Sequence, residues 1–104
     1  MARYDLYANP TAGERRHTPF LLDVQNDFID ALATRVVIPL RTTAAFGPRA
    51  RHLNPVLRVG NDELVLDAAA LGAIIASELR RPVDNLRSQQ ALVAEALDAL
   101  FGAY

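Results

Sequence analysis

The sequence predicts a small α+β domain, most simply a curved antiparallel β-sheet with a helix packed on it. Several short apolar segments, separated by turns that contain glycine, proline or asparagine, indicate strands. Two of these segments flank Gly60-Asn61-Asp62, which favours a hairpin. The last segment, residues 88–101, instead repeats its apolar residues at helical spacing.

Residues 3–7 and 20–24 are the first two expected strands. Tyr4 and Leu6 alternate with polar residues, and this period of two is typical of a half-buried strand. Residues 8–19 contain Asn9-Pro10, Gly13 and Pro19, which predict a polar loop between the two strands. We therefore expect the strands to pair across this loop.

Residues 35–41 form the next expected strand, because valine, isoleucine and leucine dominate them. Pro39 has no N–H to donate, so we expect this strand at a sheet edge, a bulge or a subunit boundary. Residues 55–59 and 63–66 complete the sheet as a hairpin, since Gly60 tolerates the positive φ of a tight turn.

Residues 68–79 are ambiguous, because their alanines favour a helix while Gly72 and Ile74-Ile75 oppose it. The terminal helix is clearer: its apolar stripe consists of Val93, Leu97, Leu100 and Tyr104. Its expected N-cap is Asp84 or Ser88, and Gly102 is its expected C′ residue.

Length, composition and charge bound the function. The chain has 104 residues, no cysteine and a formal net charge of −1. This fits a single domain over residues 1–104 without disulfides, thiolate zinc sites or a cysteine nucleophile. The balanced charge argues against nucleic-acid binding by the chain alone. We expect a cytoplasmic protein with no membrane partner, because no apolar run approaches the roughly 18–20 residues of a membrane span and residues 1–10 do not form a signal peptide.

Two groups of side chains are candidates for chemistry. Asp23, Asp27 and Asp30 could hold a hard cation if they shared a helix face, but we favour caps or solvated turn residues. His17 and His52 each follow arginines and could serve a ribonuclease as acid, base and phosphate clamp. Such loop side chains are more often only solvated. We therefore predict no catalytic residue, no metal and no cofactor.

Residues 101–104 place Phe101 and Tyr104 at a chain end, where domains usually fray. These aromatic side chains either complete the core stripe or project as an anchor for a partner. Physical reasoning alone favours the core.

Three segments and the terminal helix together resemble the CcdB family of plasmid-addiction toxins. The segments read LLDVQNDFID over residues 21–30, VVIPL over 36–40 and LNPVLRVGNDE over 53–63. The resemblance covers nearly the whole chain and implies an SH3-like antiparallel β-barrel or curved sheet with a C-terminal α-helix. It also implies a homodimer, and a strand-like path through residues 68–76.

The resemblance implies a bacterial toxin of a type II toxin–antitoxin system, and not an enzyme. Such a toxin binds the A subunit of DNA gyrase, traps gyrase with cleaved DNA and is neutralised by a cognate antitoxin. DNA is then expected to be bound only through the antitoxin complex. The implied gyrase-binding residues are Phe28, Ile29, Asp98, Phe101, Gly102, Ala103 and Tyr104.

The family's best-known members carry tryptophan where this chain has Gly102. Two alternatives therefore stay open. One is a chromosomal homologue that keeps the fold without poisoning gyrase. The other is an endoribonuclease toxin on the same general fold, whose candidate residues are Arg15, Arg16, His17, Arg51 and His52.

Overall fold

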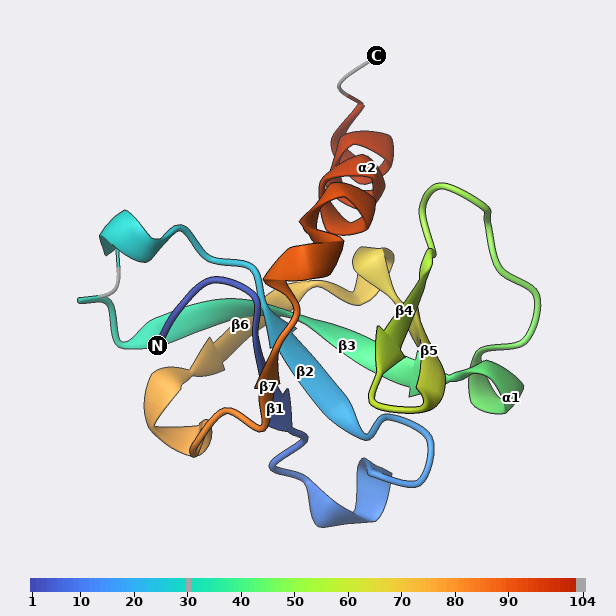
Figure 1. The fold of residues 1–104 in the computed structure, drawn as a ribbon. Helices are drawn as coiled ribbons and strands as arrows, with labels where there is room; N and C mark the ends of the chain where they lie inside the picture. Colours follow the sequence, from blue (N-terminus) through green and yellow to red (C-terminus); the bar gives the residue numbers. More distant parts are fainter. Residues whose placement is uncertain (30, 103–104) are drawn as a thin grey trace.

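The fold is a curled antiparallel sheet followed by a C-terminal helix, as Figure 1 shows. The computed structural model describes residues 1–29 and 31–102. The helices are α1 (Thr43–Phe46) and α2 (Gln90–Phe101), and the strands are β1 (Asp5–Ala8), β2 (Phe20–Asp23), β3 (Thr34–Thr42), β4 (Val56–Val59), β5 (Asp62–Leu66), β6 (Gly72–Ile75) and β7 (Asp84–Asn85). Short 3-10 turns lie between them: η1 (Ala12–Glu14), η2 (Asp27–Ile29), η3 (Ala68–Ala70), η4 (Ala76–Glu78) and η5 (Arg87–Gln89). The half-barrel with its helix confirms the predicted SH3-like α+β fold.

Strand β3 is the centre of the sheet, whose order is β4-β5-β3-β2-β1-β7 with β6 as a further partner of β3. Along one side β3 pairs with β2, so the predicted pairing of β1 with β2 extends into a three-stranded meander. Along its other side β3 first pairs with β6, up to Val37, and then with β5, from Leu40 onward.

Pro39 lies where β3 changes partner. It faces Leu21 of β2, and its carbonyl accepts a hydrogen bond of 3.0 Å from the Asp67 N–H on the opposite side. The N–H and C=O of one strand residue point to the same side, so the missing donor of Pro39 faces the junction between β6 and β5. Of the three expected positions, the sheet edge is therefore wrong: the strand is central, and proline is tolerated because neither β6 nor β5 needs its N–H there.

Apolar side chains cover both faces of the sheet. Leu22 and Ile38 lie in the main core beneath α2, with Val93 and Ala96 of the helix, and all four are fully buried. A second cluster on the other face consists of Tyr7, Leu21, Val37 and Leu79, with Ile74 packed against it. Neighbouring residues of a strand point to opposite faces, so β1 to β3 are buried on both. The prediction of a half-buried strand over residues 3–7 is therefore wrong in two respects: Tyr4 precedes β1 with a φ of 73°, and Leu6 and Tyr7 are buried on opposite faces.

An ion pair ties β2 to β3 within this second face. Arg35 Nε donates to Asp23 Oδ2 at 2.8 Å, Nη2 lies 2.7 Å from the same oxygen, and both side chains are fully buried. Burial raises the pKa of Asp23, while hydrogen bonds from the Gln25 N–H and from Arg35 oppose that rise. The solvated turn role expected for Asp23 is therefore wrong, because its charge is enclosed with a partner twelve positions along the chain.

The predicted hairpin is confirmed as β4 and β5. Val59 pairs with Asp62, which leaves Gly60 and Asn61 as a two-residue turn. Gly60 has φ of +59°, the left-handed value that a type II′ turn requires at its first central position.

Residues 68–76 follow the strand-like path implied by the family resemblance. The alanines form only the turn η3, and β6 begins directly at Gly72. The β-branched pair Ile74-Ile75 then lies opposite Arg35 and Thr34 of β3. Pairing with β3 outweighs the helix propensity of the alanines.

The ion pair supplies a test of the fold. Replacing Asp23 by leucine leaves the Arg35 guanidinium buried without a counter-charge, so we expect a loss of about 3–5 kcal/mol in unfolding free energy. The double variant Asp23→Leu/Arg35→Met removes both charges and should be more stable than the single variant. Urea unfolding followed by circular dichroism measures both. If the double variant were less stable than Asp23→Leu, the result would contradict the claim that the Arg35 charge is tolerated only because Asp23 pairs with it.

Candidate functional site

Helix α2 carries most of the residues expected to contact a partner. Its first turns are fixed to the sheet, because Val93 and Ala96 are fully buried in the main core. Further along, Leu97 and Leu100 are only partly buried, and Phe101 is 69% exposed. Figure 1 shows the helix leading away from the sheet toward its C-terminal end. The prediction that Phe101 completes the core is therefore wrong. The helix extends beyond the sheet, so the sheet does not cover the Phe101 side chain.

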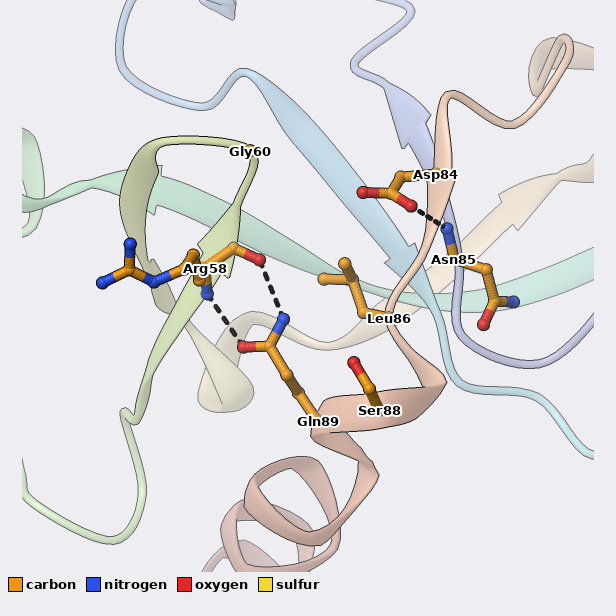
Figure 2. Close-up of a pocket in the computed structure, with 7 residues that line it drawn as sticks. All are labelled: Arg58, Gly60, Asp84, Asn85, Leu86, Ser88 and Gln89. Atoms are coloured by element: carbon orange, nitrogen blue, oxygen red, sulfur yellow. Dashed lines mark hydrogen bonds between the residues drawn. The ribbon is translucent and has the colours of Figure 1, made fainter.

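The base of α2 is fixed by a side chain that was not predicted. The Gln89 amide donates to the Arg58 carbonyl at 2.8 Å and accepts from the Arg58 N–H at 2.8 Å (Figure 2). The side-chain amide thereby makes the same pair of hydrogen bonds with β4 that the backbone of a neighbouring strand would make. A cavity of about 500 Å³ lies beside this contact, bordered by both residues and by Asp84, Asn85 and Ser88. No sequence pattern distinguishes a glutamine that makes such a pairing from one that is simply solvated, so the sequence alone could not indicate it.

The predicted N-caps of α2 are wrong. Asp84 lies in β7, paired with Leu6, and Ser88 lies within η5 beside the cavity of Figure 2. The helix begins after Gln89 without a side-chain cap, because η5 already provides a preceding turn. The helix is consequently positioned by Gln89 and by its buried face, and not by a capping residue.

The C-terminal end of α2 matches the prediction. Gly102 adopts the left-handed conformation, with φ of 74° and ψ of 48°, and its N–H donates to the Asp98 carbonyl at 2.9 Å. Glycine takes this conformation without the strain of a Cβ, so Gly102 ends the helix directly after Phe101. The side chains of Asp98 and Phe101 are three residues apart, hence on neighbouring parts of one exposed face. Ala103 and Tyr104 lie outside the described residues.

Phe28 and Ile29 form a second exposed group, in the turn η2 between β2 and β3. Phe28 is 94% exposed and Ile29 is 50% exposed. The turn is nevertheless well fixed: Asn26 Oδ1 accepts from the Phe28 N–H at 2.9 Å, and Gln25 Nε2 donates to the Ile29 carbonyl at 2.8 Å. The fold thus holds an aromatic ring outward on an ordered turn, which is typical of a contact residue.

The two exposed groups come from different parts of the molecule. In Figure 1 the η2 connection lies at the left and the end of α2 at the top. Two further exposed apolar side chains, near the start of β3 and at the end of β6, were not predicted: Leu32 is 55% exposed and Ile75 is 56% exposed. The pairing of Ile75 with Thr34 brings them close in the sheet. Sequence could not identify them, because their exposure depends on how β6 pairs.

The remaining candidates do not assemble into a catalytic site in the described residues. Asp27 Oδ1 accepts from the Arg3 N–H at 2.5 Å, and Asp30 lies outside the described residues. Among residues 1–29 and 31–102, no three carboxylate or imidazole side chains are arranged to hold a metal ion. His17 Nδ1 contacts Thr18 Oγ1 at 2.7 Å, while His52 Nδ1 pairs with Glu95. The His17 carbonyl accepts from the Thr42 N–H at the end of β3, whereas His52 pairs with Glu95 of α2, so the two histidines have different partners.

Comparison with known families identifies the fold. The family model described as CcdB protein matches residues 3–102. The chain belongs to the CcdB family. Members of the CcdB family are gyrase-poisoning toxins of toxin–antitoxin systems rather than enzymes, which supports that general role here. A search of curated proteins gives no match. The match includes the described candidates from Phe28 to Gly102 and ends before Ala103.

The described part of the chain contains no helix with the length and apolar character that crossing a membrane requires.

Tyr7 provides a pH-dependent test of the second apolar cluster, in which it packs with Leu21, Val37 and Leu79. Burial, together with the negative charges of Asp5 and Asp23, raises the pKa of Tyr7 from 10.0 to about 12, although the positive charge of Arg35 opposes this rise. Between these values the unfolded chain releases the phenol proton while the folded chain keeps it, so stability falls as pH rises from about 10 to 12.

We expect a loss on the order of 2 kcal/mol over this range that is absent in Tyr7→Phe. Urea unfolding at several pH values measures the difference between the two proteins. Equal pH dependence of the two proteins would contradict the enclosed position of the phenol.

Proposed function

We propose that this CcdB family member is a toxin that binds the DNA gyrase A subunit and traps gyrase with cleaved DNA. A cognate antitoxin neutralises it, and it acts as a homodimer. The observation that carries the proposal is the exposure of Phe101 at a rigid helix end. The ring is 69% exposed on a helix whose base is buried and whose last turn is closed by Gly102.

Phe101 is a suitable anchor because an aromatic side chain buries about 150–250 Å² in a contact. A tryptophan next to it, as in the family's best-known members, would stack on an arginine of the target. Gly102 cannot supply that contact. We assign the contact to Phe101, whose ring can attract a guanidinium by about 0.5–2 kcal/mol, with the Asp98 carboxylate on the same face as a further partner for a cation.

Phe28 and Ile29 are proposed as the second gyrase contact, and Ala103 and Tyr104 as its extension beyond Gly102. Ordered aromatic side chains that remain in solvent are characteristic of binding hot spots. Asp98, Phe101 and Gly102 would act together, because they share one helix turn. Phe28 and Ile29 would engage the target at a separate point.

The homodimer is supported by the patch around β6. Leu32 and Ile75 are both more than half exposed, beside a strand whose only partner among the described residues is β3. Apolar side chains next to an open strand edge favour contact with a second chain. With a net charge of −1, binding to DNA is assigned to the complex with the antitoxin.

Gly102 also favours a second candidate function. A homologue that lacks the stacking tryptophan could keep the fold and the dimer, yet no longer poison gyrase. The experiment that separates the candidates uses purified protein, gyrase and supercoiled DNA, with linear DNA released from trapped complexes as the readout.

Substitution of Phe101 tests the proposed function. We expect the wild-type protein to accumulate linear DNA and Phe101→Ala to need at least about tenfold more protein for the same yield, because an anchor residue is lost. Leu92→Ala is the matched control: Leu92 is 39% exposed on the same helix, and the variant should behave as wild type.

Three other results would contradict parts of the proposal or favour the second candidate. Wild-type protein that releases no linear DNA supports the non-poisoning homologue. Equal activity of Phe101→Ala contradicts the helix-end contact. Digestion of RNA by the wild-type protein, lost in His17→Ala or His52→Ala, would contradict the proposal altogether.

Substitution of Ile75 tests the homodimer. Placing a charge in the patch with Ile75→Lys should convert a dimer into a monomer, as measured by sedimentation equilibrium. Val83→Lys is the control, since Val83 is 57% exposed but lies outside the patch. A wild-type monomer, or dissociation by the control alone, would contradict this interface.

A further inference from the structure

A small arginine-lined cavity lies between the β1–β2 loop and the segment that leads into β7. Its volume is about 290 Å³, and it is lined by Ala8, Pro10, Arg15, Arg80 and Arg81. No carboxylate lines it, whereas the cavity of Figure 2 includes Asp84 and a third cavity includes Asp62 and Glu63. Both contributing loops lie at the lower end of the sheet in Figure 1, away from the end of α2. We propose that this cavity binds a phosphate group through the three guanidinium groups.

Arg15 is held in position by the loop itself. Its Nε donates to the Asn9 carbonyl at 2.6 Å, which leaves its Nη groups for a ligand. Asn9 is in turn only 3% exposed, and its Nδ2 donates to the Thr18 carbonyl at 2.9 Å. Its backbone N–H donates to the Pro19 carbonyl at 3.0 Å, which closes the loop. The Arg15 side chain is therefore preorganised, so less entropy is lost when it binds an anion.

Arg80 and Arg81 are carried by a short segment that is fixed at both ends. Leu79 before them is 6% exposed and packs in the second cluster with Tyr7 and Leu21. Val83 after them donates its N–H to the Leu6 carbonyl at 2.7 Å, which returns the chain to β1. The backbone that carries the two arginines is thus fixed, and both border one cavity with Arg15 although they are more than sixty residues away in sequence.

The three arginines that line the cavity have no ion-pair partner in the part of the chain that the structure describes. The ion pairs among the described residues join Asp23 with Arg35, Arg41 with Asp67, His52 with Glu95 and Arg87 with Asp27, and none involves the three arginines. The neighbouring Glu14 does not border the cavity, and its Oε1 accepts from Asn9 Nδ2 at 3.3 Å. Arg15 also borders the cavity of Asp62 and Glu63 but forms no ion pair with either.

Three like charges around one cavity repel each other unless an anion is present. Guanidinium groups present planar pairs of donors that match the oxygens of a phosphate. The volume lies at the lower limit of ligand cavities, which accommodates a phosphate group or a small molecule that carries one. The source is either the free ion or the phosphate of a small molecule such as a nucleotide. The site is independent of the gyrase contact, so either assignment stands if the other fails.

Calorimetric titration of the full chain with sodium phosphate at fixed ionic strength tests the site. We expect saturable binding with one ion per chain, weakened at least about tenfold in Arg80→Gln/Arg81→Gln and in Arg15→Gln, because each loses charge-assisted hydrogen bonds. Arg16→Gln is the matched control: Arg16 is an exposed loop neighbour that does not line the cavity, and its variant should bind as wild type.

Parallel titration with adenosine monophosphate distinguishes the two sources. Tighter binding of the nucleotide than of inorganic phosphate, with the same variants weakened, assigns the site to a phosphorylated small molecule. Equal or weaker binding assigns it to the free ion. Thermal unfolding without ligand verifies that each variant folds. Absence of saturable binding by both probes, or an equal loss in Arg16→Gln, would overturn the proposal.

Discussion

Strand β3 forms hydrogen bonds with three neighbouring strands and contributes side chains to both apolar clusters. The rest of the structure depends on these contacts. Strand β3 pairs with β2 along one side and with β6 and then β5 along the other. Val37 and Ile38 point to opposite faces, so each face of the sheet receives its own apolar cluster. Arg35 adds a buried charge that, among the described residues, pairs only with Asp23 of β2. Because α2 packs on one of these clusters, the position of the helix end also follows from β3.

The sequence predicted the features that depend on local patterns. Gly60 identified the hairpin turn and Gly102 the helix end, since both positions require a positive φ. Features that depend on distant partners were missed. Pro39 is tolerated because β6 and β5 meet opposite it, and Asp23 is buried because Arg35 pairs with it. The exposure of Phe101 was likewise not predictable from its apolar spacing, because the spacing does not reveal where the sheet stops covering the helix.

The candidate site was found through family resemblance and not through a residue pattern. An exposed contact surface has no required spacing, so Phe28 and Phe101 could equally have been core residues. The structure adds the physical reason for their exposure: Phe28 lies on a hydrogen-bonded turn, and Phe101 is the last helical residue before a left-handed glycine. Gly102 therefore has a structural role of its own as the left-handed residue that ends α2, and under the proposed function the aromatic contact would be made by Phe101.

The central claim is that the protein acts through the surface at the end of α2 on a partner. Hydrogen–deuterium exchange of the intact protein, with and without the gyrase A subunit, measures this most directly. The account predicts slower exchange over residues 98–102, with unchanged exchange in the β4–β5 hairpin. Unchanged exchange at the helix end in a complex that has demonstrably formed, with protection elsewhere, would contradict it.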